Sequence, residues 1–388
     1  MKKKLSVMIS VLLAALLAGG VFAAAAAPAY RQTHVVEDYR KQNVSAAWKY
    51  YDGCARALDG SGGMPDLCIP GLDEAADMVP QGIAYFAAKN QMLISAYSKR
   101  DAGSVVFALD MTDGHLAAEY HIIRRSGSPA NGHFGGIAVS ANNLYFADYA
   151  STISYVPLRL LNAADGEAAD VTLAGTVDLA AYLNAANTSF VSCGGGMLWT
   201  GNYYDGDDEG YARKAADDCN TLLICYQLDE SSSESEWASL QGEENACAAP
   251  TYTLRVPDAV ENVQGAYLLG ETAYLNTSYG RNRNGILYTA RVDYDGGCLL
   301  ADGLRTTDAL PSVEDVEIVD GTMYTLAENG AWHFRGGDGG SVASHPFDTV
   351  WKVDLDALAK AQANPLIRFV QRLIRFFCLL LENLKSLF

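Results

Sequence analysis

The sequence predicts an all-β protein folded as a β-propeller of five four-stranded blades, closed by an N-terminal strand and followed by a C-terminal amphipathic helix. Two observations lead to this prediction. One pattern of strands and turns recurs five times between residues 66 and 357. The segments on either side of these repeats differ from them in charge and in hydrophobic periodicity, which separates them from the blades.

The N-terminal segment has the composition of a secretory signal peptide. Three lysines, Lys2–Lys4, precede an apolar stretch from Leu5 to Ala18, and small residues then continue to Ala27. A basic start, a short apolar region and an A-x-A-like end predict removal of residues 1–27 and a secreted or extracellular protein. Residues 28–65 are expected to be irregular or helical, with a helical pattern at Val44–Tyr51.

The repeat is clearest in the second strand of each unit, where a tyrosine ends four of the five copies. These strands are Leu93–Tyr97, Tyr145–Tyr149, Trp199–Tyr203, Leu275–Tyr279 and Tyr324–Glu328. The first strands share a glycine-containing motif, as in Pro80-Gln-Gly-Ile-Ala84, Phe134-Gly-Gly-Ile-Ala138 and Val263-Gln-Gly-Ala266, with looser copies at Phe190–Cys193 and Val313–Val316. The third strands are Val105–Asp110, Thr152–Pro157, Leu222–Tyr226, Ile286–Ala290 and Thr349–Val353.

The spacing of the repeats suits blades that carry loop insertions. Corresponding residues, aligned as Gln81, Gly135, Ser192, Gln264 and Glu314, lie about 50 to 70 residues apart. The fifth repeat has no fourth strand before residue 358, and Leu67–Gly71 resembles the fourth strand at Leu254–Asp258. We therefore expect the N-terminal side to supply the missing strand. The alternative is six blades, with a degenerate one in residues 30–60.

Charge and cysteine content limit the function classes. Without residues 1–27, which hold three lysines and no acid, 25 basic residues face 46 acidic ones, for a net charge of −21. This balance argues against a nucleic-acid partner, because such binding needs basic patches. Eight cysteines in an exported chain suggest disulfides, and Cys54 with Cys68 is the preferred pair. Cys225 lies in a strand pattern and is expected in the core.

The candidate ligand site is the face where the loops before each first strand and after each second strand emerge. Long insertions at 203–220, 279–285 and 328–348 fall on this face. Loops on a rigid scaffold are where binding usually resides. For the candidate tyrosines the alternative role is packing between blades, and for the other candidate residues it is structural hydrogen bonding. The candidate ligand-binding residues are Gln81, Tyr97, His133, Asp148, Tyr149, Asn202, Tyr203, Gln264, Tyr279, Arg281, Glu314 and Glu328, with Ser189 at the matching place in the third repeat.

Several of these residues suggest more specific chemistry. The neighbouring acids Glu314 and Asp315 suit cation binding or acid–base work. The insertion Asp205–Glu209 resembles the start of a calcium loop without its full pattern, so calcium is the ion considered. Arg281 and Arg283 suit a carboxylate or sulfate, or else neutralise nearby acidic loops. No nucleophile elbow, zinc-protease motif or phosphate-binding loop occurs, and catalytic residues are not assigned.

The C-terminal segment 358–388 is expected to form a linker and an amphipathic helix over residues 366–388. Four basic residues and one acid give this helix a charge of +3. Charges at Arg368, Arg372 and Arg375 interrupt the apolar run and disfavour a membrane-spanning helix. The pattern is typical of a helix that binds a membrane surface or a partner protein, with packing on its own propeller as the other possibility.

The quoted motifs resemble the secreted propellers of Gram-positive bacteria that carry no assigned activity. The resemblance covers residues 66–357 and includes the segments at Pro80–Ala84, Gly132–Val139, Val263–Gly265 and Ser278–Arg281. More distantly, the chain is similar to gluconolactonase-like and strictosidine-synthase-like propellers. That similarity implies a divalent metal in the central channel, with Glu314, Asp148 and Asn202 as the nearest counterparts of its ligands.

Three functions remain open at this point. The first is an exported binding protein that takes a sugar or cell-envelope fragment at the loop face. The second is a divalent-metal-dependent, lactonase-like hydrolase. The third is a protein-docking scaffold tethered by its C-terminal helix.

Overall fold

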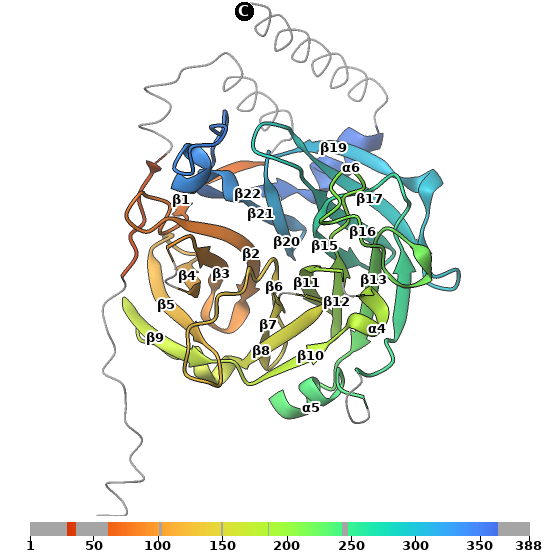
Figure 1. Ribbon diagram of the computed structural model, residues 1–388, viewed down its shortest axis with the longest axis horizontal. Coiled ribbons are helices and arrows are strands. Elements are labelled where there is room, and N and C mark those ends of the chain that lie inside the picture. The colour runs from red at the N-terminus through yellow and green to blue at the C-terminus, as the bar shows by residue number, and fades with distance from the viewer. Residues whose placement is uncertain are drawn as a thin grey trace, which may run out of the picture.

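The computed structural model describes residues 29–35, 61–100, 103–148, 150–184, 186–242 and 247–363 (Figure 1). Four features predicted from the sequence lie outside these ranges: the signal peptide, the helical pattern at Val44–Tyr51, Tyr149 and the amphipathic helix 366–388.

The fold is an all-β propeller, as predicted, and its strands are arranged around a central axis (Figure 1). They group into antiparallel four-stranded units, each running outward from the axis. The first two units are β2 (Met78–Phe86), β3 (Gln91–Ser98), β4 (Ser104–Asp110) and β5 (Leu116–Ile123), then β6 (Ile137–Val139), β7 (Asn143–Asp148), β8 (Thr152–Pro157) and β10 (Gly175–Asp178). The next two are β11 (Thr188–Gly194), β12 (Met197–Asn202), β13 (Leu222–Gln227) and β14 (Tyr252–Arg255), then β15 (Val263–Leu269), β16 (Thr272–Thr277), β17 (Gly285–Asp293) and β19 (Arg305–Ala309). The last is β20 (Val313–Val319), β21 (Thr322–Ala327), β22 (Thr349–Asp354) and β1 (Gly62–Cys68).

The two ends of the ring meet in the last unit, which combines strands from both ends of the chain. Its outer strand β1 pairs antiparallel with β22, so that Gly62 lies opposite Lys352 and Cys68 opposite Thr349. The predicted closure by an N-terminal strand is confirmed, although the strand ends at Cys68, earlier than Leu67–Gly71 would place it. The inner strand β20 lies against both β15 and β2, so the last unit contacts the fourth unit on one side and the first on the other.

Smaller elements link and cover the blades. Strand β9 (Glu167–Thr172) extends the first blade by pairing parallel to β5, and β18 (Cys298–Leu299) joins β14 to β17. Three helices are present in the described ranges: α4 (Ala180–Leu183), α5 (Ser233–Ala238) and α6 (Leu355–Ala363). None of them is long and apolar enough to cross a membrane.

The repeated glycine of the first-strand motif allows neighbouring inner strands to approach at the axis. A Cβ on Gly82 would lie 2.7 Å from the backbone nitrogen of Ile137 on the next blade. A Cβ on Gly136 would lie 2.8 Å from Phe190 Cα, and one on Gly265 would lie 2.7 Å from Asp315 Cα. Contacts below 3 Å with backbone atoms cannot be relieved by a side-chain rotation. The glycine is therefore required by ring closure, which explains why the motif recurs.

The strand register corrects the alignment of the third repeat. Leu93 pairs with Ala84 in the first blade, and Trp199 pairs with Ser192 in the third. Ser192 is therefore equivalent to Ala84, and Ser189 occupies the place of Gln81. The sequence alignment was shifted because the third repeat lacks the glycine that marks this position in its neighbours.

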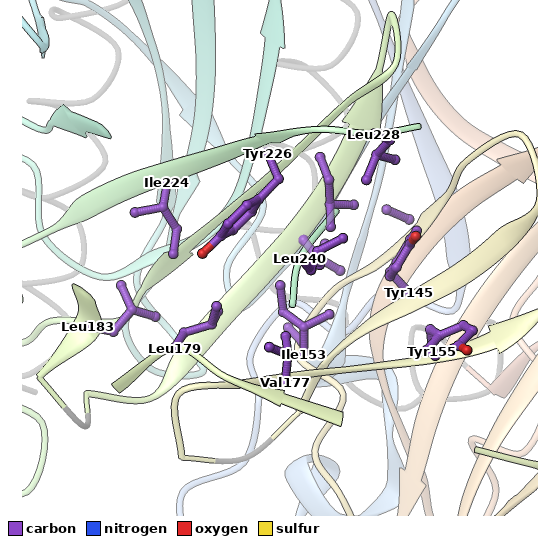
Figure 2. Packing of buried hydrophobic residues seen from close by; sticks show 14 of the residues in the cluster. Tyr145, Ile153, Tyr155, Val177, Leu179, Leu183, Ile224, Tyr226, Leu228 and Leu240 are labelled. Atoms are coloured by element: carbon purple, nitrogen blue, oxygen red, sulfur yellow. The ribbon is translucent and has the colours of Figure 1, made fainter. Parts of the chain in front are cut away.

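The hydrophobic core is divided into clusters that fill the spaces between adjacent blades. Figure 2 shows the cluster between the second and third blades, where Tyr145 and Ile153 face Ile224 and Tyr226. Cys225, on the other face of β13, is fully buried in the next cluster, as expected. Burial of each large apolar side chain contributes about 1.5–3 kcal/mol, so these clusters supply the main attraction between blades.

Helix α5 fastens the third blade to the second through a buried carboxyl. The side chain of Glu236 accepts hydrogen bonds from Ser140 Oγ at 2.5 Å, from the backbone nitrogen of Asn142 at 3.0 Å and from Asn142 Nδ2 at 2.9 Å. The Tyr145 hydroxyl adds a contact at 3.3 Å, and the neighbouring Trp237 stacks on Tyr155 with ring centroids 4.3 Å apart. Glu236 is completely buried, so its acceptor capacity is used inside the protein.

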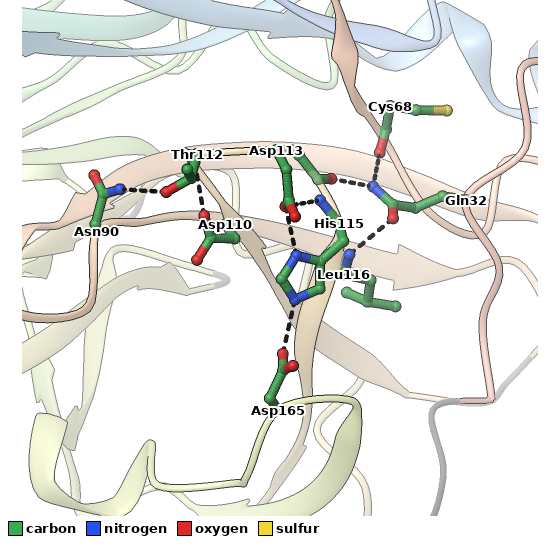
Figure 3. A network of polar contacts seen from close by, with 10 residues as sticks. Gln32, Cys68, Asn90, Asp110, Thr112, Asp113, His115, Leu116 and Asp165 are labelled. Atoms are coloured by element: carbon green, nitrogen blue, oxygen red, sulfur yellow. Dashed lines mark hydrogen bonds and ion pairs between the residues drawn. The ribbon is translucent and has the colours of Figure 1, made fainter.

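The N-terminal segment 29–35 is held against the closing strand. Gln32 Nε2 donates to the carbonyls of Cys68 (2.9 Å) and Gly114 (2.7 Å), and Gln32 Oε1 accepts from the backbone nitrogen of Leu116 at 2.8 Å (Figure 3). The buried carboxyl of Glu119 accepts from the backbone nitrogen of Ala29 at 3.0 Å. These contacts attach the start of the described chain to the first blade and to the seam of the ring.

Of the two cysteines in the predicted disulfide, Cys54 also lies outside the described ranges, and Cys68 lies at the seam of the ring. Cys68 is a free cysteine with 4% of its surface exposed, and it packs at the seam near Leu67 and Ile69. Burial raises the pKa of its thiol to about 12, so it stays protonated at neutral pH. No disulfide links any pair of cysteines within the described ranges.

An ion-pair network occupies the turn between β4 and β5. His115 Nδ1 lies 2.5 Å from Asp113 Oδ1, and its Nε2 lies 2.7 Å from Asp165 Oδ1 (Figure 3). The hydrogen bond with Asp113, and then that with Asp165, raise the pKa of His115 to about 9. The imidazole therefore stays charged at neutral pH and links this turn to the loop that precedes β9.

We expect this network to weaken as the pH rises through about 9. The folded-state pKa of His115 lies above its unfolded value of about 6.5, so the stabilisation is complete below pH 6.5 and disappears above about pH 9. Its size is small, because all three side chains are solvent-exposed. An NMR titration of the His115 ring should give a midpoint near 9, and Asp165→Asn should lower it. A midpoint near 6.5 in the unsubstituted protein would show that the ion pairs do not form.

Candidate functional site

Strand pairing brings two sets of loops to one rim of the propeller. The start of each inner strand lies opposite the end of the second strand, as in Val79 with Tyr97, Thr188 with Asn202 and Val263 with Thr277. The loops that precede first strands and those that follow second strands therefore meet at the same end of the axis. We call the residues gathered there the mouth: Gln81, Tyr97, Lys99, His133, Tyr203, Tyr211, Glu314 and Glu328.

One side of the mouth is an aromatic stack between the first and second blades. The rings of Tyr97 and His133 lie 4.1 Å apart at an angle of 23°, and Lys99 Nζ lies 4.9 Å from the centre of the Tyr97 ring. Tyr97 is 8% exposed, whereas His133 keeps a larger surface open to solvent. Partial desolvation, and then the charge of Lys99, lower the pKa of His133 to about 4. At neutral pH this imidazole is therefore uncharged, and the stack presents a flat, mostly apolar surface.

A pair of carboxyls lies beside this stack. Glu328, directly after β21, accepts a hydrogen bond of 3.1 Å from Gln81 Nε2, which links the last blade to the first. Glu314, near the start of β20, is only 2% exposed. Burial raises the pKa of Glu328 to about 7, against the opposing effect of the Gln81 hydrogen bond. Burial, and then the charges of Glu328 and Asp315, raise the pKa of Glu314 well above its ordinary value. The pair therefore resists carrying two negative charges at once.

Two more acids of β20 lie deeper along the axis. Asp315 is fully buried, and its Oδ2 accepts from the backbone nitrogens of Ile83 at 3.2 Å and Ile137 at 3.1 Å. It thereby joins the inner strands of three blades. Glu317 occupies the position that Ala84 takes in the first blade. Burial raises the pKa of both carboxyls well above the ordinary range.

The third blade contributes the opposite side of the mouth. Tyr203 and Tyr211 meet edge to face with ring centroids 5.3 Å apart, and Asn262 Nδ2 donates to the Tyr203 hydroxyl at 3.0 Å. Burial is the main cause that raises the pKa of Tyr203, followed by the charges of Asp205 and Glu314. In addition to burial, the charges of Glu314 and Tyr211 also raise the pKa of Tyr97. The charge of Glu314 thus acts on both Tyr97 and Tyr203, and Tyr211 packs against Tyr203.

Other predicted ligand-binding residues are engaged elsewhere. Arg281 pairs with Asp338 through both terminal nitrogens and lies over the Phe334 ring at 4.7 Å, so it anchors the insertion 328–348. Tyr279 is 46% exposed and contacts Arg283 rather than the carboxyl pair. Gln264, near the start of β15, is partly exposed.

Two of the three residues considered as metal ligands are engaged in hydrogen bonds within their own blades. Asp148 is buried and accepts from Ser154 Oγ at 2.8 Å, with Arg124 at 3.8 Å. Asn202 donates through Nδ2 to the Asn220 carbonyl and accepts through Oδ1 from the Leu222 nitrogen, so it holds the ends of the insertion 203–220. Within the described ranges, no three Asp, Glu, His or Cys side chains form a group able to hold a metal ion.

Sequence reasoning missed Lys99, Tyr211 and Glu317 as residues of the axis and mouth. Lys99 and Tyr211 lie in or beside loops, outside the repeated strand pattern. Glu317 carried a detectable signal, since the strand Val313-Glu-Asp-Val-Glu317 places an acid where the first and second blades have alanine.

No protein-family model matches this chain, and no curated protein matches it. The expected resemblance to gluconolactonase-like and strictosidine-synthase-like propellers therefore has no counterpart in these comparisons.

Solved structures resemble it in fold at very low identity. One is CoXyl43, a GH43 β-xylosidase/α-arabinofuranosidase from a compost microbial metagenome in complex with xylotriose, with 10% identity, 76% of this chain and 94% of that chain covered, and a TM-score of 0.41. Another is the GH43_1 enzyme from Xanthomonas citri complexed with xylose, with 10% identity, 80% and 93% covered, and a TM-score of 0.40. Hydrazine synthase from Kuenenia stuttgartiensis matches with 9% identity over 63% of this chain and a TM-score of 0.34, and the match spans only 55% of that chain.

Proposed function

We propose that this protein binds a carbohydrate, free or as part of a cell-envelope fragment, at the mouth, and that it works outside the cell. The observation that carries the proposal is the Tyr97–His133 stack beside the Gln81–Glu328 hydrogen bond. A sugar ring has apolar C–H faces and a rim of hydroxyls. It therefore fits a flat aromatic surface next to an amide and a carboxyl that exchange hydrogen bonds with hydroxyls.

The rigidity of the surrounding structure supports this proposal. Gln81 and Tyr97 lie within strands of the first blade, and Asn262 orients the Tyr203 hydroxyl. Groups held on strands lose little freedom when a ligand binds, so fewer contacts are needed for measurable affinity. The export predicted from residues 1–27 is the basis for placing this function at the cell exterior.

We expect His133→Ala to weaken oligosaccharide binding about tenfold, because an aromatic contact contributes about 0.5–1.5 kcal/mol. Isothermal titration calorimetry with xylotriose and with trimers of glucosamine and of N-acetylglucosamine would measure the loss. His133 is partly exposed, so the substitution should leave folding intact. Leu269→Ala is the matched control, because Leu269 is 48% exposed at the opposite end of its blade. Equal affinities for both variants, or no binding of any trimer by the unsubstituted protein, would rule out this site.

A second candidate function is hydrolysis of the bound sugar, favoured by the paired carboxyls Glu314 and Glu328. Two carboxyls whose environments raise their pKa values suit a division into general acid and base. Release of new reducing ends from a bound oligosaccharide, abolished by Glu328→Gln, would support it. Binding without any turnover would leave the protein a carbohydrate receptor.

A further inference from the structure

The carboxyl of Glu314 receives no hydrogen bond from the part of the chain that the structure describes. Glu314 is 2% exposed. Besides burial, the charge of another carboxyl, Glu328, raises its pKa, and the charge of Glu314 in turn raises the pKa values of Tyr97 and Tyr203. Its backbone carbonyl is used, because Asn276 Nδ2 donates to it at 3.2 Å. A buried carboxyl is normally paired with a cation or fully hydrogen-bonded. Glu314 therefore lacks a partner of opposite charge.

A second acid, from a different blade, has one unpaired oxygen. Asp205 is 4% exposed, and its Oδ1 accepts from the backbone nitrogen of Asp207 at 3.0 Å, whereas its Oδ2 has no hydrogen-bond partner among the described residues. After burial, the charges of Asp205 and of Glu314 both raise the pKa of Tyr203. Acids from two blades therefore act on one tyrosine of the mouth.

The cations of the rim do not neutralise these acids by contact. Lys99 lies over the rings of Tyr97 and Phe334, at 4.9 and 5.9 Å. Arg281 is held by Asp338. The other titratable groups that surround the carboxyl pair are Asp77, Tyr97, His133, Tyr203, Tyr211, Asp315 and His333.

The surroundings suit an organic cation better than a metal ion. A metal ion needs several oxygen or nitrogen ligands around one point, and no such group occurs within the described ranges. An ammonium group on a carbon ring is larger and makes favourable contacts with aromatic faces as well as with carboxylates. Tyr97 and Tyr203, on which the charge of Glu314 acts, supply such rings, and Tyr211 packs against Tyr203.

We infer that the sugar bound at the mouth carries a free amino group, so that its ammonium pairs with Glu314 and Glu328. This inference rests on the proposed carbohydrate site and adds the class of sugar. The hydroxyls and the ring use the Tyr97–His133 stack and Gln81, and the ammonium supplies the positive charge that the buried acids lack. An N-acetylated or plain neutral sugar offers the same ring without that charge.

The test compares trimers of glucosamine and of N-acetylglucosamine in calorimetric titrations at neutral pH and low salt, where protonated amines and ionised carboxyls are both present. We expect the glucosamine trimer to bind at least about tenfold more tightly, and this preference to shrink as salt is added. Glu314→Gln should remove the preference while the N-acetylglucosamine trimer keeps its affinity. Glu328→Gln, at a more accessible position, should reduce the preference in the same direction and provides a second variant.

The outcomes separate this inference from the proposed function. Equal affinity for the two trimers overturns the amino-sugar inference and leaves the carbohydrate site in place. A preference that persists unchanged in both variants places the ammonium elsewhere and also overturns it. Binding of neither trimer, or of any other oligosaccharide, overturns the proposed function together with this inference.

A stability measurement supplies an independent readout. Burial raises the pKa of Glu314 and Glu328, so their ionisation destabilises the folded state at a pH above the folded values and has no such effect below about pH 4. Both glutamine variants should therefore melt at a higher temperature than the unsubstituted protein at pH 8. Lower melting temperatures would show that these carboxyls stabilise the ring, which contradicts an unpaired role.

Discussion

Replacing Glu236 with alanine should lower the free energy of unfolding by about 4 kcal/mol, because it removes a buried acceptor and leaves its donors unpaired. Ser140 Oγ, the backbone nitrogen and Nδ2 of Asn142, and the Tyr145 hydroxyl would all lose their partner inside the protein. Urea unfolding followed by tryptophan fluorescence would measure the change, and Trp237 is a reporter at the contact between α5 and the second blade.

Glu234→Ala is the matched control on the same helix. The Glu234 side chain is 73% exposed and its ion pair with Arg159 is 3.7 Å long, so its loss should change stability by less than about 0.5 kcal/mol. Similar losses for the two variants would mean that the cost arises from the loss of an acid in the first turn of α5 and that the buried contacts of Glu236 contribute little.

Gly265→Ala should destabilise the propeller by about 3 kcal/mol through overpacking at the axis. The added methyl group would lie 2.7 Å from Asp315 Cα and 2.9 Å from the backbone nitrogen of Val316. Both atoms belong to the inner strand of the next blade, so relief requires two blades to separate. The same movement would shift Asp315 away from the nitrogens of Ile83 and Ile137. Thermal unfolding by circular dichroism would give the size of the effect.

Gly303→Ala tests whether any glycine substitution has this effect. A Cβ at Gly303 would meet only Arg291, at 3.7 Å, which is an ordinary contact. We expect its melting temperature to stay close to that of the unsubstituted protein. If Gly265→Ala behaves in the same way, the axis is looser than the structure indicates, and the role assigned to the repeated glycine is wrong.

The fold was predictable from the sequence because each blade repeats the same local signals. Strands such as β8 and β22 begin where the pattern of apolar residues begins, and the glycine motif marks the inner strands. The third repeat was misaligned because Phe190 stands where its neighbours have glycine, so only pairing with Trp199 reveals the register. Repetition thus predicts architecture well and fails locally where one copy departs from the motif.

The site was only partly predictable, because it depends on contacts between different blades. Sequence position placed Gln81, Tyr97, His133, Glu314 and Glu328 on one rim. The structure stacks Tyr97 on His133 and joins Gln81 to Glu328 by a hydrogen bond. Arg281 and Asn202 were predicted to lie on the same face, yet their side chains hold insertions in place. No spacing rule in the sequence distinguishes a side chain that faces the axis from one that anchors its own loop.

The mixed origin of the last blade sets the order in which this chain folds. Strand β22 near one end of the described chain needs β1 near the other, and segment 29–35 is bound to Glu119 on the first blade. Four blades consist of strands adjacent in sequence and are able to assemble as the chain emerges, whereas the fifth waits for the arrival of β22. Until then β1 has an unpaired edge, so one copy is open to strand exchange with another copy during this interval.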